Sequence, residues 1–114
     1  MNIQELIEQL NRLGEQEKIE AKTGFGKSAL ETICAFSNEP ELRGGYLLLG
    51  IKEHHTRDEL SFQVVGVDHP QKTLEDLVSQ CRAVFNHPVA IETAQQVING
   101  KVVIGIFENC RSIT

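Results

Sequence analysis

The chain has 114 residues, of which 40% are hydrophobic and 24% are charged, a composition typical of a folded globular domain and not of a disordered segment. Sixteen acidic and eleven basic side chains give a formal net charge of −5, and this acidic excess is unusual for a domain that binds nucleic acid by itself. No apolar run approaches the ~18 residues of a membrane-spanning helix, and the acidic N-terminal residues do not resemble a signal peptide, so we expect a single cytoplasmic domain over residues 1–114 that does not contact membranes.

The first part of the chain is predicted to form two helices and a short strand. Apolar residues at helical spacing predict a helix over residues 3–13. Residues 18–22 alternate polar and apolar side chains, which is typical of a short half-exposed strand. Ser28 then stands three residues before Glu31, and this capping-box spacing predicts a second helix that runs to about Asn38.

Two strands separated by loops are predicted next. Residues 39–45 form a loop, because a proline and two adjacent glycines interrupt the pattern. The continuous apolar run 46–51 predicts a central strand that is covered on both faces. A polar loop over 52–60 separates it from a further strand over 62–67.

The last part of the chain is predicted to form a helix and a hairpin. A third helix opens near Thr73 and ends before Pro88. Asn99-Gly100 favours a type I′ turn between strands at 89–98 and 101–107. The order predicts an α+β fold, in which a mixed sheet of about five strands ends in a β-hairpin and packs against about three helices. The core-facing side chains of the third helix are predicted to be Leu74, Leu77, Val78, Cys81 and Phe85.

Residues 21–28 nearly match the phosphate-binding loop of nucleotide-binding proteins, in which a glycine and four further residues precede Gly-Lys-Ser or Gly-Lys-Thr. Ala21 takes the place of the first glycine, and the strand before it carries charged residues where such a strand is normally buried. We therefore expect a turn that leads into a capped helix, and no ATP site.

A candidate metal site consists of acidic side chains from the short strand, the residues before it and the end of the central strand. Carboxylate oxygens are the ligands that Mg²⁺ and Mn²⁺ prefer. The alternative is that these acids are solvated and paired with nearby lysines. The adjacent His54-His55 would contribute one ligand at most, because neighbouring side chains of an extended chain point to opposite sides. The acidic residues are Glu15, Glu17, Glu20 and Glu53.

Gly44 and Gly45 lie between a predicted helix end and a predicted buried strand. Glycines at such a position allow a ligand phosphate or another backbone to approach closely. The alternative is a tight connection whose glycines satisfy local geometry only.

Four short sequence motifs, taken in their order along the chain, resemble those of the Schlafen-type Alba-like domain, a family described as DNA-binding. The resemblance extends over residues 5–110, and it departs from the family in the segment 39–43, where relatives have a shorter connection. The motifs are Glu20-Ala21-Lys22, Ile33-Cys34-Ala35-Phe36-Ser37-Asn38, Gly44-Gly45-Tyr46-Leu47-Leu48-Leu49-Gly50-Ile51 and Val65-Gly66-Val67-Asp68.

The resemblance implies a context and a second activity. Such domains typically stand at the N-terminus of longer bacterial proteins described as transcriptional regulators, so we expect this chain to be the N-terminal fragment of one, with downstream domains as partners. In some eukaryotic relatives three acidic residues form a metal-dependent endoribonuclease, and the corresponding positions here are Glu15, Glu20 and Glu53. The last is a glutamate where that pattern has aspartate, and Lys52 replaces an acid before it.

Three hypotheses follow for function. The leading one is a DNA- or RNA-binding module of a multidomain transcriptional regulator, which contacts phosphates and needs no cofactor. The second is an endoribonuclease that uses Mg²⁺ or Mn²⁺ held by the three acids, so enzymatic activity is left open, with a non-enzyme favoured. The third is a module for homo-oligomerisation or docking. The residues predicted to contact nucleic acid are Lys18, Lys22, Lys27, Arg43, Lys52, Gly44 and Gly45.

Overall fold

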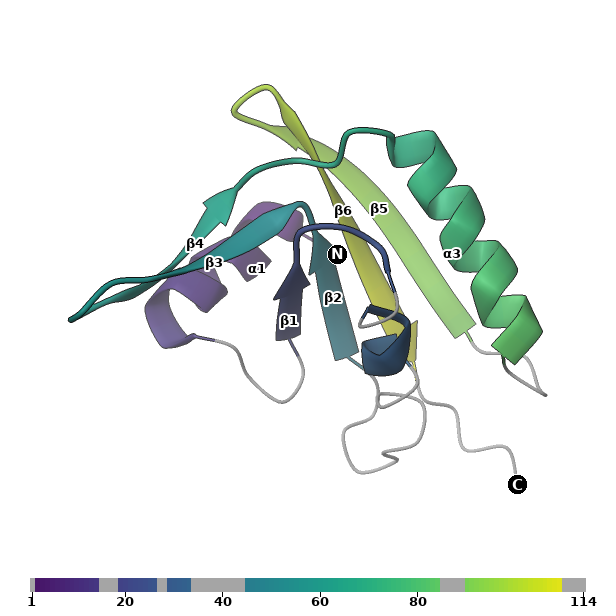
Figure 1. Ribbon diagram of the computed structural model, residues 1–114, viewed down its shortest axis with the longest axis horizontal. Helices are drawn as coiled ribbons and strands as arrows, with labels where there is room; N and C mark the ends of the chain where they lie inside the picture. Colours follow the sequence, from purple (N-terminus) through teal and green to yellow (C-terminus); the bar gives the residue numbers. More distant parts are fainter. Residues whose placement is uncertain (1, 15–18, 27–28, 34–44, 85–89, 110–114) are drawn as a thin grey trace.

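The computed structural model describes residues 2–14, 19–26, 29–33, 45–84 and 90–109, and within them it has an α+β fold, as predicted (Figure 1). Four strands form a mixed sheet in the order β1-β2-β6-β5, and two more form a separate antiparallel ribbon, β3-β4. Residues 29–33 are also helical. The labelled elements are α1 (Ile3–Leu13), β1 (Ile19–Lys22), β2 (Gly45–Leu49), β3 (Ile51–His55), β4 (Leu60–Val64), α3 (Pro70–Val84), β5 (Ala90–Ile98) and β6 (Lys101–Asn109).

Helix α1 has the bounds that its apolar periodicity predicts. The side-chain oxygen of Asn2 accepts a hydrogen bond from the backbone N–H of Glu5 at 3.1 Å, which satisfies one of the donors that a helix start leaves unpaired. Gly14 ends the helix with a φ of 76°, and its N–H donates to the Leu10 carbonyl at 2.8 Å.

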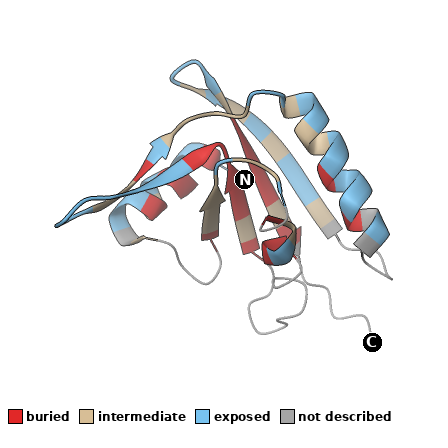
Figure 2. Cartoon of the chain, in the orientation of Figure 1, coloured by how far each residue is buried: buried red, intermediate tan, exposed pale blue. Residues whose placement is uncertain are grey.

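The mixed sheet is covered on both faces, which confirms the prediction for its central strand β2. Its three leucines are fully buried: Leu48 joins the core formed with α1, whereas Leu47 and Leu49 join the core formed with α3 and the helical residues 29–33. Strand β1 runs parallel to β2, and β6 runs antiparallel to it. Figure 2 shows this burial concentrated in β2 and β6, with the ribbon and the outer side of α3 exposed.

The strand predicted over 46–51 is in fact interrupted at Gly50. This corrects the end of that strand and the start of the loop predicted after it. Gly50 has a φ of 98°, and its carbonyl accepts the N–H groups of both Val65 and Gly66 at 2.9 Å. The chain therefore leaves the mixed sheet and continues as β3, where a loop was predicted. Strand β4 likewise ends earlier than the predicted range 62–67.

The polar ribbon is held against α1 by its apolar face. Phe62 is buried among the apolar residues of α1, with Leu60 packed beside it. The backbone N–H of Phe62 also donates to the side-chain oxygen of Asn11 at 2.9 Å. Because the other face is solvated, the sequence of β3 carries too few apolar residues to show a strand pattern.

Helix α3 begins three residues before the predicted Thr73, at Pro70. Proline suits the first helical position, because its φ is already helical and its missing N–H would have no partner there. Leu77 and Cys81 are buried as predicted, but Val78 is 42% exposed, since it lies about 100° around the helix from Leu77. The predicted core residue Phe85 lies outside the described residues.

The C-terminal hairpin is confirmed. Ile98 pairs with Lys101, so the loop has two residues, and both have positive φ, 54° at Asn99 and 75° at Gly100. These are the angles that a type I′ turn requires. Within the residues that the structure describes, no helix is long and apolar enough to cross a membrane.

Candidate functional site

The structure describes five of the ten residues predicted to bind or cleave nucleic acid. They are Glu20, Lys22, Gly45, Lys52 and Glu53. The others, Glu15, Lys18, Lys27, Arg43 and Gly44, lie outside the described residues, as does Glu17.

Lys22 and Glu20 stand at the end of β1 and point to the same side of the sheet. The Lys22 Nζ lies 3.8 Å from the Glu20 Oε1, and each side chain is about one third exposed, at 30% and 35%. The Lys22 carbonyl accepts the N–H of Gly50 at 2.9 Å, which fixes the end of β1 to the start of β3. The lysine is therefore positioned by backbone, but part of its charge is offset by the neighbouring acid.

Lys52 and Glu53 project from opposite faces of the ribbon. Lys52 pairs with Gln63 on the solvated face, whereas Glu53 pairs with Phe62 on the face that packs toward α1. The exposed His55 shares the face of Glu53, and its Nε2 lies 3.1 Å from the Glu53 Oε1. His54 and His55 are both exposed, and they point to opposite faces of β3, as the extended chain predicts.

The two described acids of the predicted metal site lie on different faces of the fold. Glu20 shares the sheet face of Leu47, on the α3 side. Glu53 shares the ribbon face of Ile51, on the α1 side. Among the residues described, no group of three or more His, Cys, Asp or Glu side chains is arranged to hold a metal ion. Because Glu15 lies outside them, the three-acid site stays a prediction.

Gly45 is the first residue of β2, where a loop was predicted, and it is buried opposite Glu108 of β6. Gly45 is therefore part of the mixed sheet, and because Gly44 lies outside the described residues, the proposed phosphate contact of this glycine pair stays a prediction. By contrast, Gly24 and Gly26 of the predicted turn have nothing within 4 Å of the place where a Cβ would stand.

Two glycines that the sequence did not single out for function form a backbone crossing beside Lys22 and Lys52. We call Gly50 and Gly66 the glycine junction. A Cβ on Gly50 would lie 3.1 Å from the Gly66 Cα, and a Cβ on Gly66 would lie 2.8 Å from the Lys101 Cβ. Both residues also have positive φ, 98° and 79°. No local pattern announces this crossing, because it joins segments far apart in sequence.

The sequence profile of the family described as Schlafen, AlbA_2 matches residues 15–111 of the chain. The chain belongs to the Schlafen AlbA_2 family. This AlbA_2 domain is also similar to a solved structure, the solution NMR structure of the N-terminal domain of a protein from Nitrosomonas europaea that is named as related to the ATP-dependent DNA helicase RecG. The two are 35% identical with a TM-score of 0.86, over 96% of this chain and 73% of the other. No curated protein matches the sequence.

The structural similarity reaches further than the family profile. The profile begins at residue 15, after α1, whereas 96% coverage leaves too few residues uncovered to omit that helix. Because α1 supplies a large part of one core, it belongs to this AlbA_2 domain and not to a separate preceding segment.

One buried acid of the AlbA_2 domain was not expected from the sequence. Glu108 of β6 is 1% exposed, and neither carboxylate oxygen has a hydrogen-bond partner in the part of the chain that the structure describes. Burial raises the pKa of Glu108 from 4.5 to about 7, because an apolar environment disfavours the charged form. Its side chain shares the sheet face of Ile106, which belongs to the α3-side core.

Proposed function

We propose that this AlbA_2 domain binds nucleic acid through phosphate contacts. The observation that carries the proposal is its similarity, along 96% of its length, to the N-terminal domain of a protein named as related to a DNA helicase. A domain at the start of such a protein is well placed to hold the nucleic acid on which the remainder acts.

The chemistry of the β1–β3 edge supports this proposal. Lys22 and Lys52 come from two elements that the Gly50 hydrogen bond holds together. Lysine ammonium groups bind phosphates as point charges. A lysine on a strand is held in place more precisely than a lysine on a long loop. Lys22 and Lys52, together with four further predicted contacts, make up what we call the proposed rim. The four further contacts are Lys18, Lys27, Arg43 and Gly44.

Aromatic residues near this edge favour binding that does not depend on base sequence. The Tyr46 ring packs against Phe107, with centroids 4.8 Å apart, and Phe25 packs against the α3-side core. Rings engaged in the fold are poorly placed to stack on bases. Phosphate contacts, by contrast, carry no sequence information directly.

We further propose the finer context that the family resemblance implies. The domain would serve a cytoplasmic, multidomain transcriptional regulator, with DNA as its partner and the downstream domains of the same protein as its neighbours. Self-association through this domain remains the alternative role. Light scattering over a range of concentrations separates the two, because a strictly monomeric domain contradicts self-association.

Fluorescence anisotropy tests the central proposal. Labelled duplex and single-stranded DNA and RNA should each bind at low salt, and Lys22→Ala should weaken that binding. Arg12→Ala on α1 removes the same charge away from the proposed rim and should leave affinity near that of the unchanged protein. An absence of binding to all four nucleic acids at low salt would refute the proposal.

A further inference from the structure

The glycine junction brings together chain segments that carry lysines. The Gly50 carbonyl accepts the N–H groups of Val65 and Gly66, and the N–H of Val67 donates to the Val102 carbonyl, each at 2.9 Å. The segment between β4 and α3 is therefore bonded both to the start of β3 and to the start of β6. A Cβ on Gly66 would clash with the Lys101 Cβ, and a Cβ on Gly50 would be tight against the backbone of Gly66, so the crossing is closely packed.

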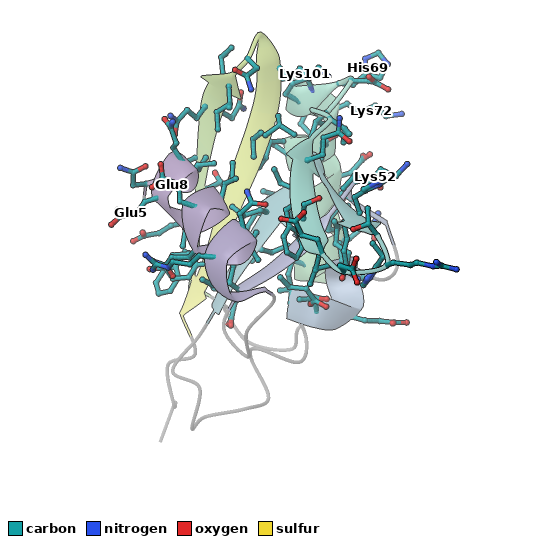
Figure 3. All side chains as sticks on the ribbon, turned by 90° about the vertical axis from the view of Figure 1, so that its left-hand side faces the viewer. Glu5, Glu8, Lys52, His69, Lys72 and Lys101 are labelled. Atoms are coloured by element: carbon teal, nitrogen blue, oxygen red, sulfur yellow. The ribbon has the colours of Figure 1, made fainter. Side chains whose placement is uncertain are left out.

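Three lysines stand on the elements that lead into or out of this crossing, each on a different element. Lys52 lies two residues after Gly50 on β3, Lys101 begins β6 with its Cβ against Gly66, and Lys72 is in the first turn of α3. Figure 3 shows the three lysines on one side of the molecule, with Glu5 and Glu8 of α1 on the other. Figure 1 agrees, since the starts of β3, α3 and β6 all adjoin the segment that leads from β4 to α3.

The charges of these lysines are available to a ligand. All three side chains are exposed, and none forms an ion pair with residues 2–14, 19–26, 29–33, 45–84 or 90–109. Glu75, one turn after Lys72, instead accepts a hydrogen bond from the Gln71 side chain at 3.4 Å. Lys22, in comparison, has Glu20 beside it.

We propose that Lys52, Lys72 and Lys101 form a second phosphate-binding surface, which contacts several phosphates along one nucleic-acid strand. This inference rests on the proposed nucleic-acid binding and extends it beyond the rim predicted from sequence. Exposed ammonium groups on three separate elements suit an extended polyanion, because a small phosphate ligand is normally held in a concave site by converging donors. Lys52 belongs to both surfaces, so one strand can pass from the β1–β3 edge to the start of α3.

The test is a double variant, Lys72→Gln with Lys101→Gln. At position 101, glutamine keeps the Cβ and Cγ atoms that lie against Gly66, so the fold should persist. Thermal unfolding of the double variant checks this. Binding to a labelled DNA duplex is measured over a series of salt concentrations. Losing two phosphate contacts should weaken binding several-fold at low salt and reduce the slope of log K against log salt by about 2.

The matched control is Arg12→Gln with Arg57→Gln, which makes the same change in net charge on α1 and in the turn of the ribbon. It should leave the salt slope unchanged, and Lys72→Arg with Lys101→Arg should restore it. If the unchanged protein binds but the lysine-to-glutamine variant keeps its slope, the second surface is refuted while nucleic-acid binding stands. If the unchanged protein does not bind at all, both proposals fall together.

Discussion

At the scale of single residues, Glu108 places a titratable group inside the core. Its pKa is raised from 4.5 to about 7 by burial, so between these values the folded state holds a proton that the unfolded state releases. The free energy of unfolding must then fall as the pH rises through this window. The full loss is about 3 kcal/mol, with the stability present below pH 4.5 and gone above pH 7.

Glu108→Gln should remove this pH dependence, because an amide has no proton to lose. Urea unfolding at about pH 5 and about pH 8 should show the unchanged protein losing stability at the higher pH and the variant losing much less. Glu92→Gln, an exposed carboxylate on the adjacent strand, is the control and should leave the dependence intact. Equal pH profiles for the unchanged protein and Glu108→Gln would contradict the assignment.

Glu20 distinguishes binding from cleavage. Glu20→Gln removes the carboxylate that lies 3.8 Å from Lys22, so phosphate binding should become modestly tighter, measured by anisotropy. If the three predicted acids instead formed a metal-dependent nuclease, structured RNA incubated with Mn²⁺ would be cut, and this variant would lose the activity. Cleavage that depends on Glu20 would overturn our preference for a binding module.

At the scale of elements, the glycine junction should be the position least tolerant of a methyl group. Gly66→Ala should lower the free energy of unfolding by about 2 kcal/mol, since a φ of 79° is strained for alanine and its Cβ would meet the Lys101 Cβ. Gly24→Ala is the matched control, with nothing within 4 Å, and should change stability little. Urea unfolding compares the two, and equal stabilities would contradict the close packing at the junction.

Elements fixed by neighbouring residues were predictable from the sequence, and elements fixed by distant contacts were not. Helix α1 and the Asn99-Gly100 turn depend on local periodicity and turn chemistry, and both match the structure. The break at Gly50 depends on carbonyl bonds to residues 65 and 66, which an apolar run cannot reveal. The start of α3 depended on Pro70, which gives no apolar signal.

The candidate site follows the same division. Lys22 and Lys52 were predicted as phosphate contacts in a short strand and in a polar loop, and the structure has them on two strands that are linked through Gly50. Lys72 and Lys101 were missed, because only the packing of Gly66 against Lys101 brings the hairpin beside the segment that leads to α3. Val78 was wrongly predicted to face the core for a similar reason. Helical spacing shows which side of a helix is apolar, but it does not show how much of that side is covered by neighbouring elements.

At the scale of the whole molecule, an acidic net charge and a role in phosphate binding are compatible because three exposed lysines stand away from the glutamates of α1. The net charge is −5, yet the labelled lysines and the α1 glutamates occupy different sides (Figure 3). The excess acid lowers long-range attraction, so affinity must come from contacts at short distance. Such binding is strongest at low salt, and it should be lost steeply as salt rises.

This charge arrangement predicts affinity that depends on salt and not on base sequence. If the four described lysines of the two surfaces, Lys22, Lys52, Lys72 and Lys101, each contact one phosphate, raising salt fourfold should weaken duplex binding about 150-fold. Unrelated duplexes of equal length should bind within about a factor of two of one another, because phosphate contacts read no bases. Competition anisotropy with several sequences measures both quantities. A strong preference for one sequence would require base contacts, which would replace phosphate binding as the basis of recognition.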